Sequence, residues 1–214
     1  MEYIKSTQNA GIVLAIIEAI HENAGYLSEI DGAIGDGDHG VNMNKGFMMA
    51  KERIDSTMSL SQGFDILGKI LVMDIGGSIG PIYGTLFSQF SKGMKEEKIY
   101  PETILTALEN GVEKLMDLAG ARIGDKTLID TIYHAKRAYE TALKEQQNFQ
   151  QALENLCDGA EYGKESTKNL IAKVGRAARL GERSKGFLDA GATSCSIILK
   201  TMAHSMQKLV LENE

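Results

Sequence analysis

Apolar residues recur at intervals of three and four along most of the chain, the spacing that gathers them on one face of an α-helix. Near the C-terminal end, for example, Cys195, Leu199 and Met202 fall on one apolar stripe. Lys200 and Lys208 lie off that stripe. Alternation of apolar and polar residues, which is typical of a half-buried strand, is almost nowhere sustained. The pattern therefore predicts an all-α protein.

Eight helical segments are predicted from this periodicity. With 214 residues, the chain is long enough to bury a sizeable core, so we expect a single domain over residues 1–214. The predicted helices cover residues 5–25, 41–55, 60–73, 81–97, 102–119, 127–146, 149–173 and 191–211.

The net charge and the cysteine content narrow the class of protein. A formal charge of -6 argues against general nucleic-acid binding, which depends on clustered Lys and Arg. The longest apolar run near the N-terminus, residues 11–17, is too short to span a bilayer, and no cleavage site follows a basic start. We therefore expect a cytoplasmic protein with no membrane segment. Cys157 and Cys195 lie in predicted helices, so we expect reduced core thiols and no disulfide.

Three glycine-rich interruptions, at residues 31–40, 74–81 and 181–191, each precede a predicted helix. Glycine permits close backbone approach to a ligand, and the first N–H groups of a helix can face an anion. In the second interruption Pro81 suits the first turn of a helix, although a simple helix break would give the same pattern. In the third, cationic side chains accompany Asp189. Arg176, a little earlier, is placed to reach the same ligand, and its guanidinium suits a phosphate.

The first interruption contains three carboxylates within eight residues: Asp31, Asp36 and Asp38. If these side chains converge, their repulsion favours a hard cation such as Mg²⁺ between them, and Mg²⁺ keeps positions open for substrate phosphates. A solvated turn rich in Asp and Gly explains the loop about equally well when it is taken alone. The two other loops that suit phosphates shift the balance toward a metal and nucleotide site.

Other motif templates fit this loop poorly. Residues 35–40 have the glycine spacing of a dinucleotide-binding loop, but no strand is predicted before them and carboxylates occupy both variable positions nearest the expected pyrophosphate. A calcium-binding loop counted from Asp36 requires Gly and Glu at its sixth and twelfth positions, where the chain has Val41 and Phe47.

The segment Gly124-Asp-Lys-Thr127 is similar to the end of a P-loop, but Asp125 replaces a glycine and no strand leads into it. We interpret it as a helix start with Asp125 as cap and Asp130 in the first turns. Of the four histidines, only His39 lies in a motif. Ordinary surface or core roles are expected for His21, His134 and His204.

Four ordered motifs resemble those of the ADP-binding L subunits of bacterial dihydroxyacetone kinase, and the resemblance extends over essentially the whole chain. They are IGDGDHGVNMNKGF at 34–47, GGSIGPIYG at 76–84, GDKT at 124–127 and GRAARLGERS at 175–184. The resemblance implies an antiparallel eight-helix barrel with a nucleotide site at one end.

The resemblance also implies roles for individual residues. Asp31, Asp36 and Asp38 correspond to aspartates that hold two Mg²⁺ ions on the nucleotide phosphates. Gly120 and Leu128 correspond to residues that flank the base. The full set of implied ADP contacts is His39, Gly40, Val41, Asn42, Ser78, Ile79, Gly120, Leu128, Arg176, Asp189, Ala190 and Gly191.

The implied activity is a phosphotransfer divided between subunits. ADP remains bound as a cofactor, a phosphohistidine carrier (the M subunit) rephosphorylates it, and the γ-phosphoryl group passes to dihydroxyacetone held on a K subunit. This role requires positioning and charge stabilisation more than a general base on the nucleotide subunit. A homodimer is left open as a further assembly.

One stretch departs from the family pattern. Where relatives commonly read Gly-His-x-Asp-Pro-Gly-Ala, residues 186–192 place Phe187 and Ala190 at the His and Pro positions. The loss of Pro loosens the backbone and the loss of His removes a polar group. The alternatives are therefore an ATP-dependent kinase subunit for another small ketose or polyol, and a non-enzymatic nucleotide-sensing regulator. The sequence does not identify the phosphoryl donor.

Overall fold

The computed structural model describes residues 2–212, and within them it contains nine α-helices, two 3-10 helices and three short strands. The elements of the first half are β1 (Glu2–Lys5), α1 (Gly11–Glu22), α2 (Ala24–Ile34), α3 (His39–Lys51), α4 (Leu60–Asp74), α5 (Ile79–Gly93) and β2 (Lys98–Ile99). Those of the second half are α6 (Pro101–Ala119), α7 (Leu128–Lys144), α8 (Phe149–Ser166), η1 (Thr167–Asn169), η2 (Arg176–Ser184), α9 (Ala190–Gln207) and β3 (Leu211–Glu212).

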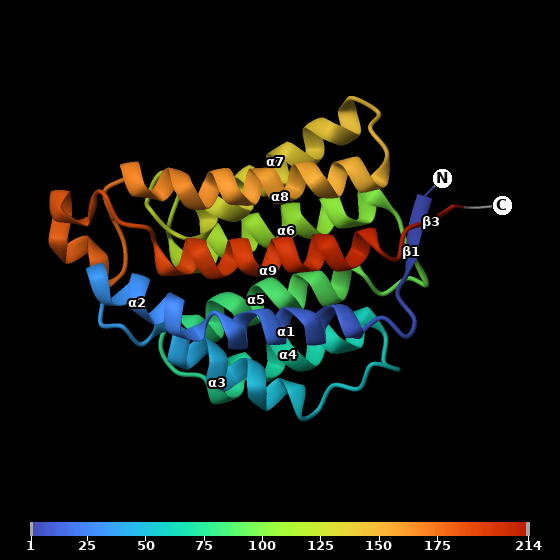
Figure 1. Cartoon of the computed structure of the whole chain (residues 1–214), viewed down its shortest axis with the longest axis horizontal. Coiled ribbons are helices and arrows are strands. Elements are labelled where there is room, and N and C mark those ends of the chain that lie inside the picture. The colour runs from blue at the N-terminus through green and yellow to red at the C-terminus, as the bar shows by residue number, and fades with distance from the viewer. Residues whose placement is uncertain (1, 213–214) are drawn as a thin grey trace.

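Eight of the helices form a closed ring. Going round it, α1 packs on α3, followed by α4, α5, α6, α7, α8 and α9, and α9 returns to α1. Their axes run along the long dimension of the molecule and successive helices alternate in direction (Figure 1). The prediction of an all-α, antiparallel eight-helix barrel is confirmed.

Helix α2 is an additional element that the periodicity did not predict, since the first predicted helix ends at residue 25 and the next begins at residue 41. Within the predicted segment 5–25, β1 ends at Lys5, a turn follows, and α1 covers Gly11–Glu22. The chain breaks at Asn23, and α2 then runs from Ala24 to Ile34. Helix α2 lies outside the ring, packed on α3 and α9. Asp31 therefore sits in the last turn of a helix, where the sequence predicted a loop.

The interior of the barrel contains a cluster of buried aromatic side chains. The rings of Phe64 and Phe87 stack with centroids 5.7 Å apart. The ring of Phe90 meets Phe64 edge to face at 5.5 Å, and Phe47 meets Phe87 in the same way at 5.8 Å. Such pairs add roughly 0.5–1.5 kcal/mol each to the free energy gained by burying apolar surface. The cluster joins α3, α4 and α5 in one core.

Helices α4 and α5 approach closely at two glycines. A Cβ atom on Gly84 would lie 2.9 Å from the carbonyl oxygen of Gly68, and a Cβ atom on Gly68 would lie 3.1 Å from that of Gly84. Larger residues at these positions would push the two helices apart. The close approach fixes where α5 begins, which matters because its N-terminus faces the candidate site.

The three strands close one end of the barrel. Strand β1 pairs antiparallel with β2, through Ile4 and Ile99, and with β3, through Tyr3 and Leu211. The sheet brings both ends of the chain to the end of the barrel opposite α2 (Figure 1). Strands of two to four residues are too short for an alternating pattern to predict.

Several other predicted boundaries are corrected by the structure. Helix α8 ends at Ser166, so the predicted helix over residues 149–173 is wrong beyond that point. The hydroxyl of Thr167 donates to the carbonyl of Lys164 (2.7 Å), and the chain then becomes extended at Leu170. Such a side-chain bond to the preceding turn competes with helix continuation.

Helix α7 is capped by Thr127, and the prediction of Asp125 as its cap is wrong. The Thr127 hydroxyl accepts a hydrogen bond from the N–H of Ile129, and the Asp130 carboxylate accepts one from the N–H of Thr127 (2.8 Å). Asp125 instead accepts from the N–H of Arg122 at 2.6 Å.

The state of the cysteines and the apolar character of the helices bear on two further expectations. Cys157 and Cys195 are free and buried, as predicted. Across residues 2–212, no helix combines the length and apolar character that crossing a membrane requires.

Candidate functional site

A cavity of about 490 Å³ lies at the end of the barrel away from the strands, where α3, α5, α7 and α9 begin. Its walls come from four parts of the chain: residues 31–42, 76–83, 118–128 and 174–191. These include parts of all three glycine-rich interruptions of the sequence. The interruptions are far apart in sequence but adjacent in space, because every second connection of an antiparallel barrel lies at the same end.

The three carboxylates of the first interruption converge at the cavity. Asp31 projects from the last turn of α2, and Asp36 and Asp38 lie in the link to α3. One oxygen atom from each lies within 4.8 Å of the others. Three carboxylate oxygens, none of them fully buried, are a donor set that suits a hard cation such as Mg²⁺. Asp36 also forms an ion pair with Arg176 from η2.

Glycine is required twice in this link. Gly37 has a φ of +78°, in the left-handed region. A Cβ atom on Gly35 would collide with the carboxylate of Asp31. These two positions explain why carboxylates and glycines alternate in the loop: the glycines allow the backbone to turn tightly enough for the carboxylates to meet.

His39 begins α3 and is held by a chain of hydroxyl groups. Its Nε2 atom lies 2.8 Å from the Ser194 hydroxyl, which lies 2.6 Å from the Tyr83 hydroxyl. Tyr83 donates to the carbonyl of Gly191 at 3.0 Å. Burial lowers the pKa of His39, although the carboxylates of Asp31 and Asp38 act in the opposite direction. The hydroxyl chain fixes the orientation of the imidazole ring.

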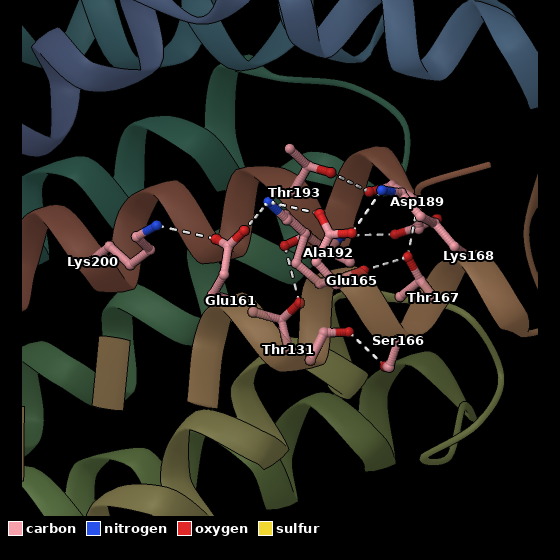
Figure 2. Close-up of polar contacts among 12 residues, drawn as sticks. Thr131, Glu161, Glu165, Ser166, Thr167, Lys168, Asp189, Ala192, Thr193 and Lys200 are labelled. Atoms are coloured by element: carbon pink, nitrogen blue, oxygen red, sulfur yellow. Dashed lines mark hydrogen bonds and ion pairs between the residues drawn. The ribbon is translucent and has the colours of Figure 1, made fainter. Parts of the chain in front are cut away.

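Asp189 caps α9 at the same cavity. Its carboxylate accepts a hydrogen bond from the N–H of Ala192 at 2.7 Å, and its own N–H donates to the hydroxyl of Thr167 at 3.2 Å (Figure 2). Burial raises the pKa of Asp189 to about 6, although the Ala192 N–H and the Lys126 ammonium favour the charged form. A carboxylate with this pKa is sensitive to what binds beside it.

The second interruption exposes the N-terminus of α5 to the cavity. Gly76 and Gly77 have open space beside them within the described chain, and Gly77 has a φ of +70°. The Ser78 side chain forms no capping bond, so it does not occupy the first N–H groups of α5. Pro81 lies in the first turn, as predicted. Free N–H groups at a helix N-terminus bind anions such as phosphate.

Most of the residues singled out from the sequence meet at this cavity. Those that line it are Asp31, Asp36, Asp38, His39, Asn42, Ser78, Ile79, Leu128, Arg176, Asp189, Ala190 and Gly191. Three others are not among its lining residues: Gly40, Val41 and Gly120.

Each of these three has a different surrounding. Gly40 packs against α2, where a Cβ atom would collide with the carbonyl of Ala24. The side chain of Val41 is 64% exposed. Gly120 ends α6 in the left-handed conformation. Among the cationic residues of the third interruption, Arg183 and Lys185 are also outside the cavity lining.

Two features of the cavity were not found by reasoning from the residues. One is Lys126, which we interpreted as part of a helix start and which is only 1% exposed. The sequence signal that could have indicated Lys126 as a cavity residue is the Gly124–Thr127 motif, of which it is part. The other is an apolar wall that includes Ile82, Leu118 and Val174, which suits a flat aromatic ring. Isolated apolar residues of this kind have no local sequence signal.

Two curated bacterial proteins are similar to this chain over most of its length. The ADP-binding subunit of PEP-dependent dihydroxyacetone kinase 1 from Listeria innocua is 36% identical over 188 residues, which cover 86% of this chain and 89% of that protein. The ADP-binding subunit of PTS-dependent dihydroxyacetone kinase from Lactococcus lactis is 34% identical over 187 residues, covering 86% of this chain and 90% of that protein.

The fold is shared with a solved structure. The dihydroxyacetone kinase of C. freundii, in complex with AMP-PNP and Mg²⁺, aligns with 92% of this chain and 33% of that chain, with a TM-score of 0.65 and 23% identity. The resemblance identified from the sequence motifs is confirmed by the curated relatives. The family model described as the DAK2 domain matches residues 33–204, and the chain therefore belongs to the DAK2 domain family.

Proposed function

We propose that this chain is the ADP-binding subunit of a dihydroxyacetone kinase. In this role it holds a magnesium nucleotide and delivers its phosphoryl group to dihydroxyacetone bound on a partner K subunit. The observation that supports this most strongly is the convergence of three carboxylates, the open N-terminus of α5 and Arg176 on one cavity. The names of the relatives from Listeria and Lactococcus support the same assignment.

Asp31, Asp36 and Asp38 would hold the metal, and we propose two Mg²⁺ ions, as the resemblance implies. When bound, Mg²⁺ neutralises charge on the phosphate oxygens and orients them for in-line transfer. The carboxylates are already within 4.8 Å of one another, so little rearrangement is needed to receive a cation.

The remaining groups of the cavity would bind the nucleotide. The first N–H groups of α5, near Ser78 and Ile79, would face the phosphates. Arg176 would exchange its ion pair with Asp36 for a phosphate contact once a cation occupies the carboxylates. The base would lie on the apolar wall near Leu128.

In this role the chain positions a phosphoryl group, and no general base need come from it. In phosphoryl transfer, positioning and charge stabilisation provide most of the catalysis. We therefore propose that the acceptor hydroxyl is activated on the K subunit and that the donor is a phosphohistidine carrier, the M subunit.

The first experiment is to denature freshly purified protein without added nucleotide and to identify what is released by mass spectrometry, with metal analysis in parallel. We expect near-stoichiometric ADP and about two Mg²⁺ per chain. A reconstitution with a phosphorylated carrier and a K subunit should then yield dihydroxyacetone phosphate. Protein that is empty and binds neither Mg-ADP nor Mg-ATP would contradict the proposal.

A second candidate is an ATP-dependent kinase subunit for another small ketose or polyol. It is favoured by the third interruption, where Phe187 and Ala190 replace the His and Pro of the family pattern and Phe187 is exposed. Protein purified empty that binds Mg-ATP reversibly, and that phosphorylates another ketose with a K-type partner, would favour this candidate.

A further inference from the structure

One segment forms part of the cavity but lies outside the ring of helices. Residues 167–189 connect α8 to α9 and contain η1 and η2. They extend beyond the end of the barrel (orange, left in Figure 1). The segment contributes Val174, Arg176 and Asp189 to the cavity wall. Its position therefore decides whether the cavity is complete.

The backbone of this segment has three points where it can hinge. Gly175, Gly181 and Gly186 all have positive φ angles, of 70°, 52° and 95°. Glycine at such positions adopts several conformations at little cost. Something outside these turns must therefore hold the segment in one place.

A buried lysine joins the two ends of the segment. The ammonium group of Lys126 donates hydrogen bonds to the carbonyl of Thr167, at the start of the segment, and to the carbonyl of Phe187, near its end (2.5 Å for the second). Lys126 is 1% exposed and adopts a φ of +64°, an unfavourable conformation for a residue with a side chain. Hydrogen bonds from a charged donor are stronger than neutral ones, and more so when buried.

Three further hydrogen bonds hold the same two ends together. The N–H of Asp189 donates to the hydroxyl of Thr167, which is completely buried (3.2 Å; Figure 2). The N–H of Gly186 donates to the carbonyl of Lys168 at 2.7 Å. The N–H of Ala172 donates to the hydroxyl of Ser184 at 2.9 Å. All of these bonds depend on the two ends staying together.

We infer that Lys126 is a positioning residue that fastens residues 167–189 across the cavity. The inference rests on the proposed function for its effect on nucleotide binding. With Lys126 present, the segment presents Arg176 and Asp189 to the ligand. Without it, the segment opens for part of the time, and the apparent affinity falls in proportion to the fraction that remains closed.

The test compares Lys126→Met with Lys168→Met. Lys168 is in the same segment, but its side chain is half exposed and forms a surface ion pair with Glu165 (2.6 Å), so the control removes a charge without removing the anchor. Hydrogen exchange is measured without nucleotide. We expect faster exchange at residues 172, 186 and 189 in Lys126→Met and unchanged exchange in the barrel helices. Lys168→Met should exchange as the wild type does.

Binding of a fluorescent methylanthraniloyl-ADP with Mg²⁺ gives the second readout. The dissociation constant of Lys126→Met should rise about tenfold or more, mainly through faster release, because two charge-assisted hydrogen bonds are lost. Mn²⁺ binding to the three carboxylates without nucleotide should not weaken, because an open segment only removes Arg176 from its ion pair with Asp36. If Lys126 contributed only to general stability, Lys126→Met would weaken the binding of both the nucleotide and Mn²⁺.

Several outcomes would overturn the inference. Equal exchange and equal nucleotide release in the two lysine variants would do so. If Lys126→Met does not fold, Lys126→Gln replaces it, since an amide can still donate to one carbonyl. If the whole barrel unfolds in both Lys126→Met and Lys126→Gln, Lys126 is a residue of the general core and the inference is wrong. If the wild type binds no Mg-nucleotide, the proposed function fails, while the exchange experiment still tests the anchor.

Discussion

Each end of the barrel has two helix N-termini with a side-chain cap and two without one, and at the cavity end the uncapped N-termini line the cavity. At the strand end, α4 and α8 begin with complete capping boxes, formed by Ser59 with Gln62 and by Asn148 with Gln151. At the cavity end α7 and α9 are capped by Thr127 and Asp189, whereas the N-cap residues of α3 and α5, Asp38 and Ser78, form no side-chain capping bond and line the cavity. A missing cap typically costs about 1 kcal/mol, and it leaves N–H groups free for an anionic ligand.

Charged groups are distributed unequally between the barrel core and the cavity end. The core of the barrel is filled by apolar and aromatic side chains, including Phe64 and Phe87. The cavity end contains a buried lysine, Lys126, and a carboxylate with a raised pKa, Asp189. The comparison teaches that the barrel core supplies the stability, while the cavity end retains ionisable groups whose charged forms are disfavoured by burial.

The largest effect should come from breaking the core. Phe87→Ala removes a ring that contacts four other aromatic rings and should lower the free energy of unfolding by about 3–5 kcal/mol. Chemical denaturation followed by circular dichroism measures it. The control is Leu118→Ala in the cavity wall, where the side chain is 50% exposed and the loss should be below about 1 kcal/mol. Similar losses in both variants would contradict the division between the two ends.

The next largest effect should be on ligand binding without loss of fold. Asp38→Asn should weaken Mg-nucleotide binding by roughly 100-fold, or about 2.7 kcal/mol by calorimetry. The melting temperature of the metal-free protein should stay the same or rise, because one of three clustered negative charges is removed. Asp74→Asn is the matched control, since Asp74 is exposed and outside the cavity lining. Unchanged affinity in Asp38→Asn would refute the metal site.

A third prediction concerns pH. The folded pKa of Asp189, about 6, is above its ordinary value of 3.8, so the folded state binds more protons between these values. Stability should therefore fall as pH rises from 4 to 6, and the full cost should persist above pH 6. Asp189→Asn, which retains a capping side chain, should gain about 1–3 kcal/mol at pH 7 relative to the wild type, with no gain at pH 3.

Asp125, at the same end of the barrel, is the control for Asp189, because its pKa is shifted in the opposite direction. Lys173 holds the pKa of Asp125 below its usual range, so this carboxylate stabilises the fold above pH 4 and the contribution is lost on acidification. Asp125→Asn should therefore lose stability at pH 7. A gain in both variants would show that the cavity end is destabilised by its total negative charge and not by Asp189 in particular.

The smallest effect compares two serines at the starts of helices. Ser59→Ala should reduce the free energy of unfolding by about 1 kcal/mol, because it removes a capping box at the strand end. Ser78→Ala at the cavity end should change it by less than about 0.5 kcal/mol. Thermal unfolding of both proteins without ligand makes the comparison. Equal losses would mean that α5 is capped by Ser78 in solution.

The site was partly predictable for a local reason. Glycines and carboxylates that occur together within ten residues, as Asp31, Asp36 and Asp38 do, indicate a binding loop wherever the chain folds. Lys126 shows the limit. Nothing in its neighbourhood indicates that Thr167 and Phe187 will surround it, because both belong to a segment more than 40 residues away. The cap was misassigned to Asp125 for a similar reason: besides the N–H of Arg122, its carboxylate binds the ammonium group of Lys173, 48 residues away.

The sequence by itself determined the all-α class, the helical segments that form the barrel and the three loops that meet at its open end. These follow from periodicity and from glycine conformation, which are properties of neighbouring residues. Only the tertiary structure decided that α2 lies outside the ring, that short strands join the two ends of the chain, and that a buried lysine fastens residues 167–189. These features depend on contacts between residues far apart in sequence, and such contacts leave no local pattern.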